Sequence, residues 1–421
     1  MKTHSQPQLC LLLVGLCTSQ LGWTADSCEQ QVLQQLGWQF KVSAASASAS
    51  ASASASADVH AHTVCQAASL QAAQNAGELV FNPVSSTPDG LQDALRGSAS
   101  RCAFQFKVGA AGQRASRKLS HNSDYRFTAL QTGWVSFGGQ GSAVQGWQQT
   151  RSFGRRFQPL HGNTQAFDAF YHGKVRTECG TGRQITQLTL LRELFGDAAF
   201  DQVFSAEELS VGTFVSLHDS DSVLLGRHAG EMVADGSGSL TAALGRQAWL
   251  GAPGMLVHVK PPRFLDDINN QAENFVVVAV TEDAQQQLAQ QQGFATINQT
   301  NTRIWQLSQQ LSMVGNRYYE RLLVERDERL WQDLPAAQKP IATAMLALLQ
   351  QPFYQGFDVH VHPMGRKPVA FHIARLLDRN PRTPFKIELT LHNLPTEIYN
   401  RWVQSQLAAC RAASKRPERK S

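Results

Sequence analysis

The sequence has no long apolar run beyond its first residues, and it has no strong charge of either sign. After Leu9–Leu16, no stretch approaches the roughly 20 apolar residues that a membrane helix needs. The 38 Lys and Arg residues stand against 33 Asp and Glu residues, which gives a formal net charge of +5, and the basic residues are scattered. A basic stripe interleaved with aromatics is missing, as is a zinc or helix-turn-helix spacing, so nucleic-acid binding is not expected.

The N-terminus carries an apolar segment that is too short to cross a bilayer. Leu9–Leu16 follows a short polar start with Lys2 and His4, and small and polar residues come next. This order is typical of a secretory signal peptide, here residues 1–25, although a buried N-terminal helix is the alternative. We therefore expect a secreted or periplasmic protein with no membrane span after signal removal.

The cysteines agree with an exported protein. Removing the signal takes two of the seven and leaves an odd number: Cys28, Cys65, Cys102, Cys179 and Cys410. Four of these can form two disulfides in any of three connectivities. At least one bridge is expected among the three N-terminal cysteines, and Cys179 is the one we expect to stay free.

Changes in composition divide the chain of 421 residues, which is long enough for two or three domains. The expected parts after the signal are an N-terminal region (26–114), a central domain (115–290), a mainly helical C-terminal region (291–410) and a basic tail (411–421). Within the first part, the alternating Ser/Ala tract at 43–57 has no bulky side chain to bury, so we interpret it as a flexible insert.

The central part predicts a long helix followed by strands. In residues 179–195, Ile185, Leu188 and Leu191 recur at helical spacing, and Gly196 is a suitable stop. Three segments rich in β-branched residues have turn-rich borders and predict strands, namely 212–219, 254–262 and 274–283. This order predicts an α+β fold with the helix packed on a mostly antiparallel sheet. The apolar spacing also predicts a helix over 302–331.

Cys179 lies between Glu178 and the glycines Gly180 and Gly182, at the predicted start of the long helix. The unpaired N–H groups and the dipole at a helix N-terminus favour thiolate and lower the pKa of a cysteine. The same N–H groups could serve as an oxyanion hole. The alternative is a small buried hydrophobic residue, since free cysteines are among the most buried residue types.

Two motifs carry a resemblance to a known family. "TECGTG" (Thr177–Gly182) contains a Glu-Cys pair ahead of the long helix, and "AENFV" (Ala272–Val276) places a Glu at the start of an apolar strand. In order and spacing, residues 163–283 resemble the bacterial spore-coat protein-glutamine gamma-glutamyltransferases, the transglutaminases of papain-like fold. The resemblance implies a papain-like α+β core.

The resemblance also implies roles for three residues. Cys179 would be the nucleophile, Glu273 the general base and Glu178 an auxiliary or substitute carboxylate. A carboxylate with a pKa of about 4 is a poor base for a thiol, so Glu273 is expected to be desolvated and its pKa raised. The family's histidine after the downstream Glu has no counterpart here, and His258 and His218 are the remaining candidates.

The implied reaction needs a glutamine of a protein or peptide as acyl donor and an amine, or water, as acceptor. It requires no metal or organic cofactor. His360, His362 and His372 could approach one another, but no fourth ligand is fixed by spacing, so no metal site is expected. Two further hypotheses are a cysteine peptidase or amidase that acts on cell-wall peptides, and a catalytically inactive envelope-binding protein.

Overall fold

A computed structural model describes residues 27–40, 63–81, 87–127, 145–150, 156–212, 232–234, 249–259, 272–289, 293–311, 317–379, 383–390 and 394–415. The signal segment, the Ser/Ala tract, His218 and the last part of the basic tail lie outside these residues. The described chain mixes helices and sheets, as the α+β prediction requires.

The largest sheet has six strands in the order β12-β11-β10-β9-β13-β8. Each neighbouring pair is antiparallel. Its strands are β8 (Met232–Ala234), β9 (Pro253–His258), β10 (Ala272–Val280), β11 (Phe357–Val361), β12 (Gly365–Pro368) and β13 (Phe385–Thr390). The predicted strands at 254–262 and 274–283 are therefore confirmed as β9 and β10. Of the segment predicted at 212–219, the structure describes Gly212 alone, which ends β7 (Val211–Gly212).

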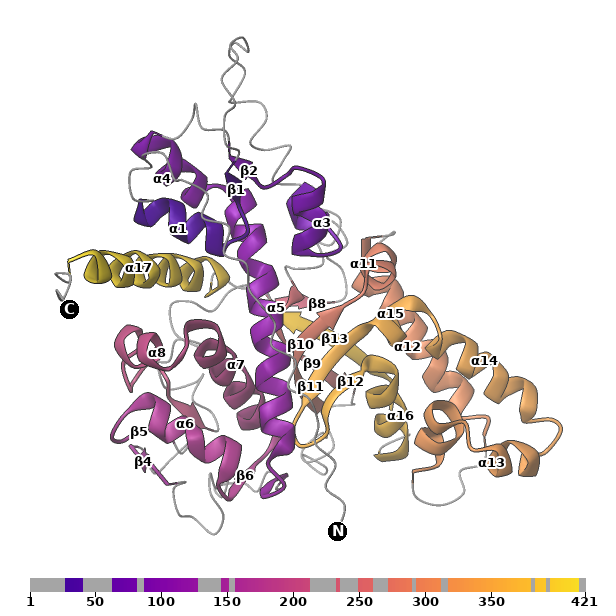
Figure 1. Ribbon diagram of the computed structural model, residues 1–421. Coiled ribbons are helices and arrows are strands. Elements are labelled where there is room, and N and C mark those ends of the chain that lie inside the picture. Colours follow the sequence, from indigo (N-terminus) through magenta and orange to yellow (C-terminus); the bar gives the residue numbers. More distant parts are fainter. Residues whose placement is uncertain are drawn as a thin grey trace, which may run out of the picture.

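Two long helices cover one face of this sheet. They are α5 (Ser98–His121), which runs through the middle of the molecule in Figure 1, and α7 (Cys179–Phe195). Val278 of β10 lies with Leu190 of α7 around Gly112 of α5, so this strand residue faces the two helices. Because successive side chains of a strand point to opposite faces, Asn274 and Val276 face the same way as Val278.

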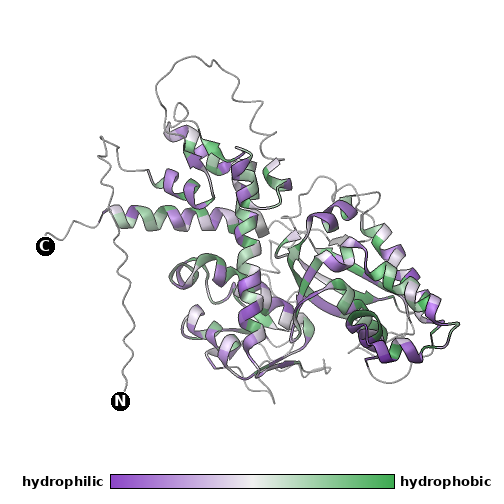
Figure 2. Ribbon diagram, turned by 45° about the vertical axis from the view of Figure 1, so that its right-hand side comes forward, coloured by the Kyte–Doolittle hydropathy of each residue, from purple (hydrophilic) through white to green (hydrophobic). Residues whose placement is uncertain are grey.

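A second set of helices covers the other face. Phe275 and Val277 of β10 belong to one hydrophobic cluster with Ile297 and Ile373. The helices whose residues contribute to this cluster are α11 (Glu282–Ala289), α12 (Phe294–Ser308), the π-helix η4 (Glu320–Glu325), α14 (Lys339–Leu349), α15 (Pro352–Gly356) and α16 (Val369–Arg379). In Figure 2 these helices carry hydrophobic and hydrophilic residues side by side, which is typical of amphipathic helices that bury one face.

The remaining elements surround α5 and α7 or lie at the edge of the second cluster. The helices are α1 (Cys28–Gln35), α3 (Leu70–Asn75), α4 (Pro88–Arg96), α6 (Asn163–His172), α8 (Asp197–Val203), α13 (Glu328–Asp333) and α17 (Leu394–Ser414). The short strands are β1 (Gln39–Phe40), β2 (Val80–Phe81), β3 (Tyr125–Phe127), β4 (Trp147–Gln149), β5 (Arg156–Pro159), β6 (Val175–Thr177) and β7. Helix α17 extends away from the sheet, beside α1 and α4 (Figure 1).

Among the cysteines that the structure describes, four form two disulfides. Cys65 is bonded to Cys102, so the bridge expected among the N-terminal cysteines is present, and Cys28 is bonded to Cys410. Cys179 is free, as expected. Two disulfides are consistent with an extracellular or periplasmic protein. Within the described ranges, no helix is both long and apolar enough to cross a membrane.

The structure differs from two expectations about organisation. The boundary expected between residues 114 and 115 falls inside α5. The described residues after 290 are mostly helical, and they also supply the strands β11, β12 and β13. The helix predicted over 302–331 is interrupted, since α12 ends at Ser308 and is followed by η4 and α13. The sheet thus combines strands from both sides of residue 290.

Candidate active site

Helix α7 begins at Cys179, and Glu178 is its N-cap. The Glu178 carboxylate accepts hydrogen bonds from the Gly180 N–H, from the Thr181 N–H at 2.5 Å and from the Thr181 hydroxyl at 2.6 Å. A Cβ atom at Gly180 would lie 2.9 Å from Glu178 Oε2, so glycine makes room for this carboxylate. The first-turn N–H groups that sequence reasoning assigned to an oxyanion hole are therefore occupied by Glu178.

The Cys179 sulfur contacts the beginning of strand β10. The Asn274 side-chain amide donates to Sγ with an Nδ2–Sγ distance of 3.2 Å. The Asn274 backbone N–H also favours the thiolate form of the sulfur. In the opposite direction, the thiol donates to the carbonyl oxygen of Ala272 at 3.7 Å. Cys179 is half-buried, so it is not enclosed in the hydrophobic core.

The electrostatic surroundings keep Cys179 as a neutral thiol. Burial raises the pKa of the Cys179 thiol, and the negative charge of Glu178 raises it further. The hydrogen bonds from Asn274 act in the other direction, and Glu273 contributes a smaller upward effect. The lowered pKa expected from the helix N-terminus is thus wrong for the free protein, because desolvation and a neighbouring carboxylate outweigh the helix dipole.

Glu273 points to the opposite face of the sheet from Cys179. Its Oε1 atom lies 2.6 Å from Nδ1 of His372 on α16, and its Oε2 atom lies 3.5 Å from Arg379. The side chain is 1% exposed. Burial alone would raise the pKa of the Glu273 carboxyl, but His372, Arg375 and Arg379 outweigh burial and lower it. The expectation of a raised pKa is therefore wrong, because sequence reasoning did not foresee these cationic and hydrogen-bonding partners.

The candidate histidines have other surroundings. His258 Nδ1 lies 3.2 Å from the carbonyl oxygen of Thr383, and its ring meets Phe385 edge to face. His360 bonds to Ser116 at 2.7 Å. Burial lowers the pKa of His360 to about 3, and proximity to His372 adds to this effect. Within the described part of the chain, no group of three or more His, Cys, Asp or Glu residues could hold a metal ion.

Sequence reasoning missed two residues beside the nucleophile. Asn274 follows Glu273 in the second motif, and the period of two in a strand means that only one of the pair can face α7. Arg183 lies one helical turn after Cys179. Burial lowers the pKa of the Arg183 guanidinium, while Glu178 and Cys179 favour its charge. Its Nε atom is buried and has no hydrogen-bond partner among the residues that the structure describes.

Comparisons with known proteins add one structural neighbour. No family model matches the chain, and no curated protein matches it. A solved transglutaminase from Geobacillus stearothermophilus, without its C-terminal extension, matches at 12% identity. The match covers 71% of this chain and 96% of that one, with a TM-score of 0.37. The neighbour belongs to the enzyme class that the two motifs resemble, but at this TM-score only the geometry around Cys179 supports a functional argument.

Proposed function

We propose that the protein is a transglutaminase-like cysteine acyltransferase with Cys179 as its nucleophile. One observation supports this proposal: the Cys179 thiol is free and half-buried at the start of α7. Its sulfur accepts hydrogen bonding from Asn274, and the thiol donates to the carbonyl oxygen of Ala272. A thiol placed among polar groups that can bind an amide is suited to acyl transfer.

The proposed reaction has two stages. The Cys179 thiol loses its proton to a carboxylate, and the sulfur attacks the side-chain carbonyl carbon of a glutamine, so that an S–C bond forms and the carbonyl electrons move to oxygen. The tetrahedral intermediate then collapses, the C–N bond breaks, and the stored proton leaves with ammonia. In the second stage, an amine attacks the thioester and releases the thiol, which gives an isopeptide bond. Water in place of the amine gives deamidation.

Glu178 is the carboxylate that we assign to the proton transfer. Its charge acts on the Cys179 thiol more strongly than the charge of Glu273 does. Its Oε2 atom accepts one backbone hydrogen bond, so a lone pair remains for the thiol proton. Because the free thiol is neutral, the proton moves only when the substrate carbonyl is in place and can accept the electron pair.

Glu273 has a different part in this proposal. It was expected to be the general base, but His372 and Arg379 hold its carboxylate on the far face of β10. We assign it to positioning, because it fixes the strand whose next residue, Asn274, contacts the sulfur. The acyl donor is a glutamine of a protein or peptide, the acceptor is an amine or water, and the reaction uses no metal or organic cofactor.

Two broader assignments accompany the activity. We propose a papain-like core, because a cysteine that opens a long helix and contacts an antiparallel sheet has the same relation in that fold. We also propose secretion or export to the periplasm, which two disulfides and an N-terminal segment with signal-peptide character support.

The test is incubation of the full chain with a glutamine-containing peptide and a labelled primary amine, read by mass spectrometry. Incorporation of the amine with loss of ammonia supports acyl transfer, and exchange of the amide for an acid supports deamidation at the same thiol. A Cys179→Ala variant should lose either product, while Gln71→Ala, which changes an exposed residue of α3, should keep it. Peptide cleavage would favour the peptidase hypothesis, and no product with any donor peptide would favour the inactive binding protein.

A further inference from the structure

The start of strand β10 presents three polar groups to the nucleophile. They are the side-chain N–H of Asn274, the backbone N–H of Asn274 and the carbonyl oxygen of Ala272. Strand β11 pairs with β10 only from Val276 onward, so at residues 272–274 the described chain has no strand on this edge. The Cys179 sulfur contacts the strand at the position where a neighbouring strand would otherwise bond.

These groups complement the two halves of a primary carboxamide. The carbonyl oxygen of a carboxamide accepts hydrogen bonds, and Asn274 offers two N–H donors from one residue. The NH₂ group of a carboxamide donates, and Ala272 offers a carbonyl acceptor. The Ala272 carbonyl and the Asn274 N–H groups are two residues apart on the same strand edge. An antiparallel strand paired at this edge would form hydrogen bonds at the same two positions.

The usual alternative donors are already engaged. The Gly180 and Thr181 N–H groups at the start of α7 bond to the Glu178 carboxylate. These N–H groups could stabilise the oxyanion of the reaction only by breaking their hydrogen bonds to the Glu178 carboxylate. Asn274 is the residue whose side-chain N–H bonds to the reacting sulfur itself.

We propose that Asn274 is a catalytic residue, which donates hydrogen bonds to the sulfur before attack and to the carboxamide oxygen during attack, while the Ala272 carbonyl receives the substrate NH₂. This inference rests on the proposed function and specifies its substrate as a primary carboxamide. Both groups lie on β10, and Glu273 between them is held on the other face by His372, so the pair is fixed by a strand anchored from behind.

The first test measures the reactivity of the Cys179 thiol and needs no substrate. Asn274→Ala removes the side-chain donor, and Asn274→Asp replaces it with a negative charge. Labelling with iodoacetamide at pH 8 is expected to slow about tenfold in Asn274→Ala, and more in Asn274→Asp, because the thiolate loses a charge-assisted hydrogen bond. Asn163→Ala is the control, since Asn163 is a buried asparagine whose amide donates to Phe204 at 2.7 Å. Its labelling rate should stay within twofold.

The second test measures transfer and recognition. The kcat of amine incorporation is expected to fall about 10²- to 10³-fold in Asn274→Ala, the usual effect of losing one oxyanion donor. A glutamine peptide should protect Cys179 of the parent protein from iodoacetamide, and the same peptide with a γ-dimethylamide, which has no N–H for Ala272, should not. Circular dichroism checks that each variant is folded.

The outcomes separate this inference from the proposed function. If the parent protein transfers no acyl group, the proposed function fails. The contact of Asn274 with the thiolate is still supported if the parent protein is labelled fastest, Asn274→Ala more slowly and Asn274→Asp most slowly. Equal labelling rates in the three proteins would overturn the role of Asn274. Equal protection by the glutamine and dimethylamide peptides would overturn the recognition of NH₂ by Ala272.

Discussion

Cys179 is held as a neutral thiol by burial and by the charge of Glu178, and this decides when it can react. In the absence of substrate, a neutral thiol reacts slowly with electrophiles, because the thiolate is the nucleophilic form. It also needs a base at the moment of attack, which makes the carboxylate beside it part of the chemistry. The hydrogen bonding of Asn274 to the sulfur lowers the pKa of Cys179 and so offsets part of the rise that burial causes.

The direction of this shift gives a pH prediction. Because the folded-state pKa of Cys179 is raised, the rate of iodoacetamide labelling should rise with a midpoint above about 8.5, the value for an ordinary thiol. The neutral thiol also contributes stability below the unfolded-state pKa, and this contribution is lost as the pH rises through the folded-state value. Glu178→Gln removes the neighbouring charge, so its labelling midpoint should lie lower. A midpoint near pH 7 in the parent protein would contradict these surroundings.

Glu273 gives a prediction of opposite sign. Its folded-state pKa is lowered, so its contribution to stability is present above the unfolded value of about 4.3 and is lost as the pH falls through the folded value. Glu273→Gln breaks a buried pair with His372 and should lower the free energy of unfolding by about 3 kcal/mol at pH 7. Urea unfolding at pH 7 and at pH 3 should show a smaller difference between the two proteins in acid. An equal difference at both pH values would be incompatible with the pairing.

At the scale of elements, the first turn of α7 packs closely against His362, which follows β11, and against Thr177 of β6. A Cβ atom at Gly182 would lie 3.0 Å from His362 Cβ and 3.3 Å from Thr177 Oγ1, so this glycine lets the first turn of α7 approach the end of β11. His362 is fixed in turn by stacking on Tyr125, with ring centroids 3.4 Å apart. The position of the nucleophile therefore depends on the close contact of Gly182 with these two side chains.

The close packing at Gly182 predicts that larger side chains at this position reduce stability and activity more. Gly182→Ala should destabilise the protein by less than Gly182→Val, for which about 2 kcal/mol is expected, since overpacking typically costs 1–3 kcal/mol. Amine incorporation should fall in the same order, because the helix start is displaced from Asn274. Thermal unfolding and kcat would both be measured. A stable Gly182→Val variant with unchanged kcat would show that α7 does not need this approach.

The elements around the site could be predicted from the sequence better than the site itself. Apolar spacing predicts α7, and β-branched runs predict β9 and β10, since these patterns depend on local burial. Which of Glu273 and Asn274 faces Cys179 depends on the face on which α7 packs, and that is a tertiary property. The partners of Glu273 come from α16, about a hundred residues further along the chain, and no local sequence pattern indicates that they are close in space.

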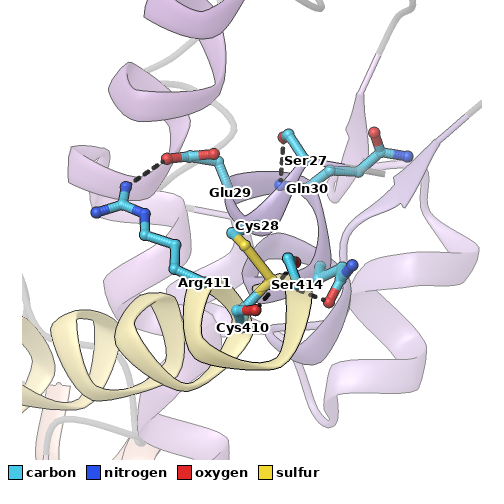
Figure 3. The surroundings of a disulfide bond; sticks show 8 residues. Ser27, Cys28, Glu29, Gln30, Cys410, Arg411 and Ser414 are labelled. Atoms are coloured by element: carbon cyan, nitrogen blue, oxygen red, sulfur yellow. Dashed lines mark hydrogen bonds and ion pairs between the residues drawn. A yellow bond between two sulfur atoms is a disulfide. The ribbon is translucent and has the colours of Figure 1, made fainter. Parts of the chain in front are cut away.

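At the scale of the whole molecule, the two ends of the described chain are joined. Cys28 of α1 and Cys410 of α17 form a disulfide across a sequence separation of 382, and Arg411 pairs with Glu29 at 3.0 Å beside it (Figure 3). The Cys65–Cys102 bridge closes a separation of only 37. A longer closed loop restricts the unfolded chain more.

The two disulfides should therefore contribute unequally to stability. Cys28→Ser/Cys410→Ser is expected to lower the free energy of unfolding by about 6 kcal/mol, and Cys65→Ser/Cys102→Ser by about 4 kcal/mol, under the chain-entropy account. Thermal unfolding of both double variants would be compared with the parent protein. A larger loss for the shorter loop would show that local packing, rather than loop length, decides the contribution.

The central claim is that the Cys179 sulfur forms a covalent bond to the acyl group of a glutamine. The most direct measurement is intact-protein mass spectrometry after rapid acid quenching of the protein with a glutamine peptide and no amine, followed by peptide mapping. The expected result is a thioester on Cys179 with the mass of the peptide less ammonia, which is discharged when an amine is added and is lacking in Cys179→Ala. An unmodified Cys179, with a range of glutamine peptides and at pH values on both sides of its thiol pKa, would contradict the account.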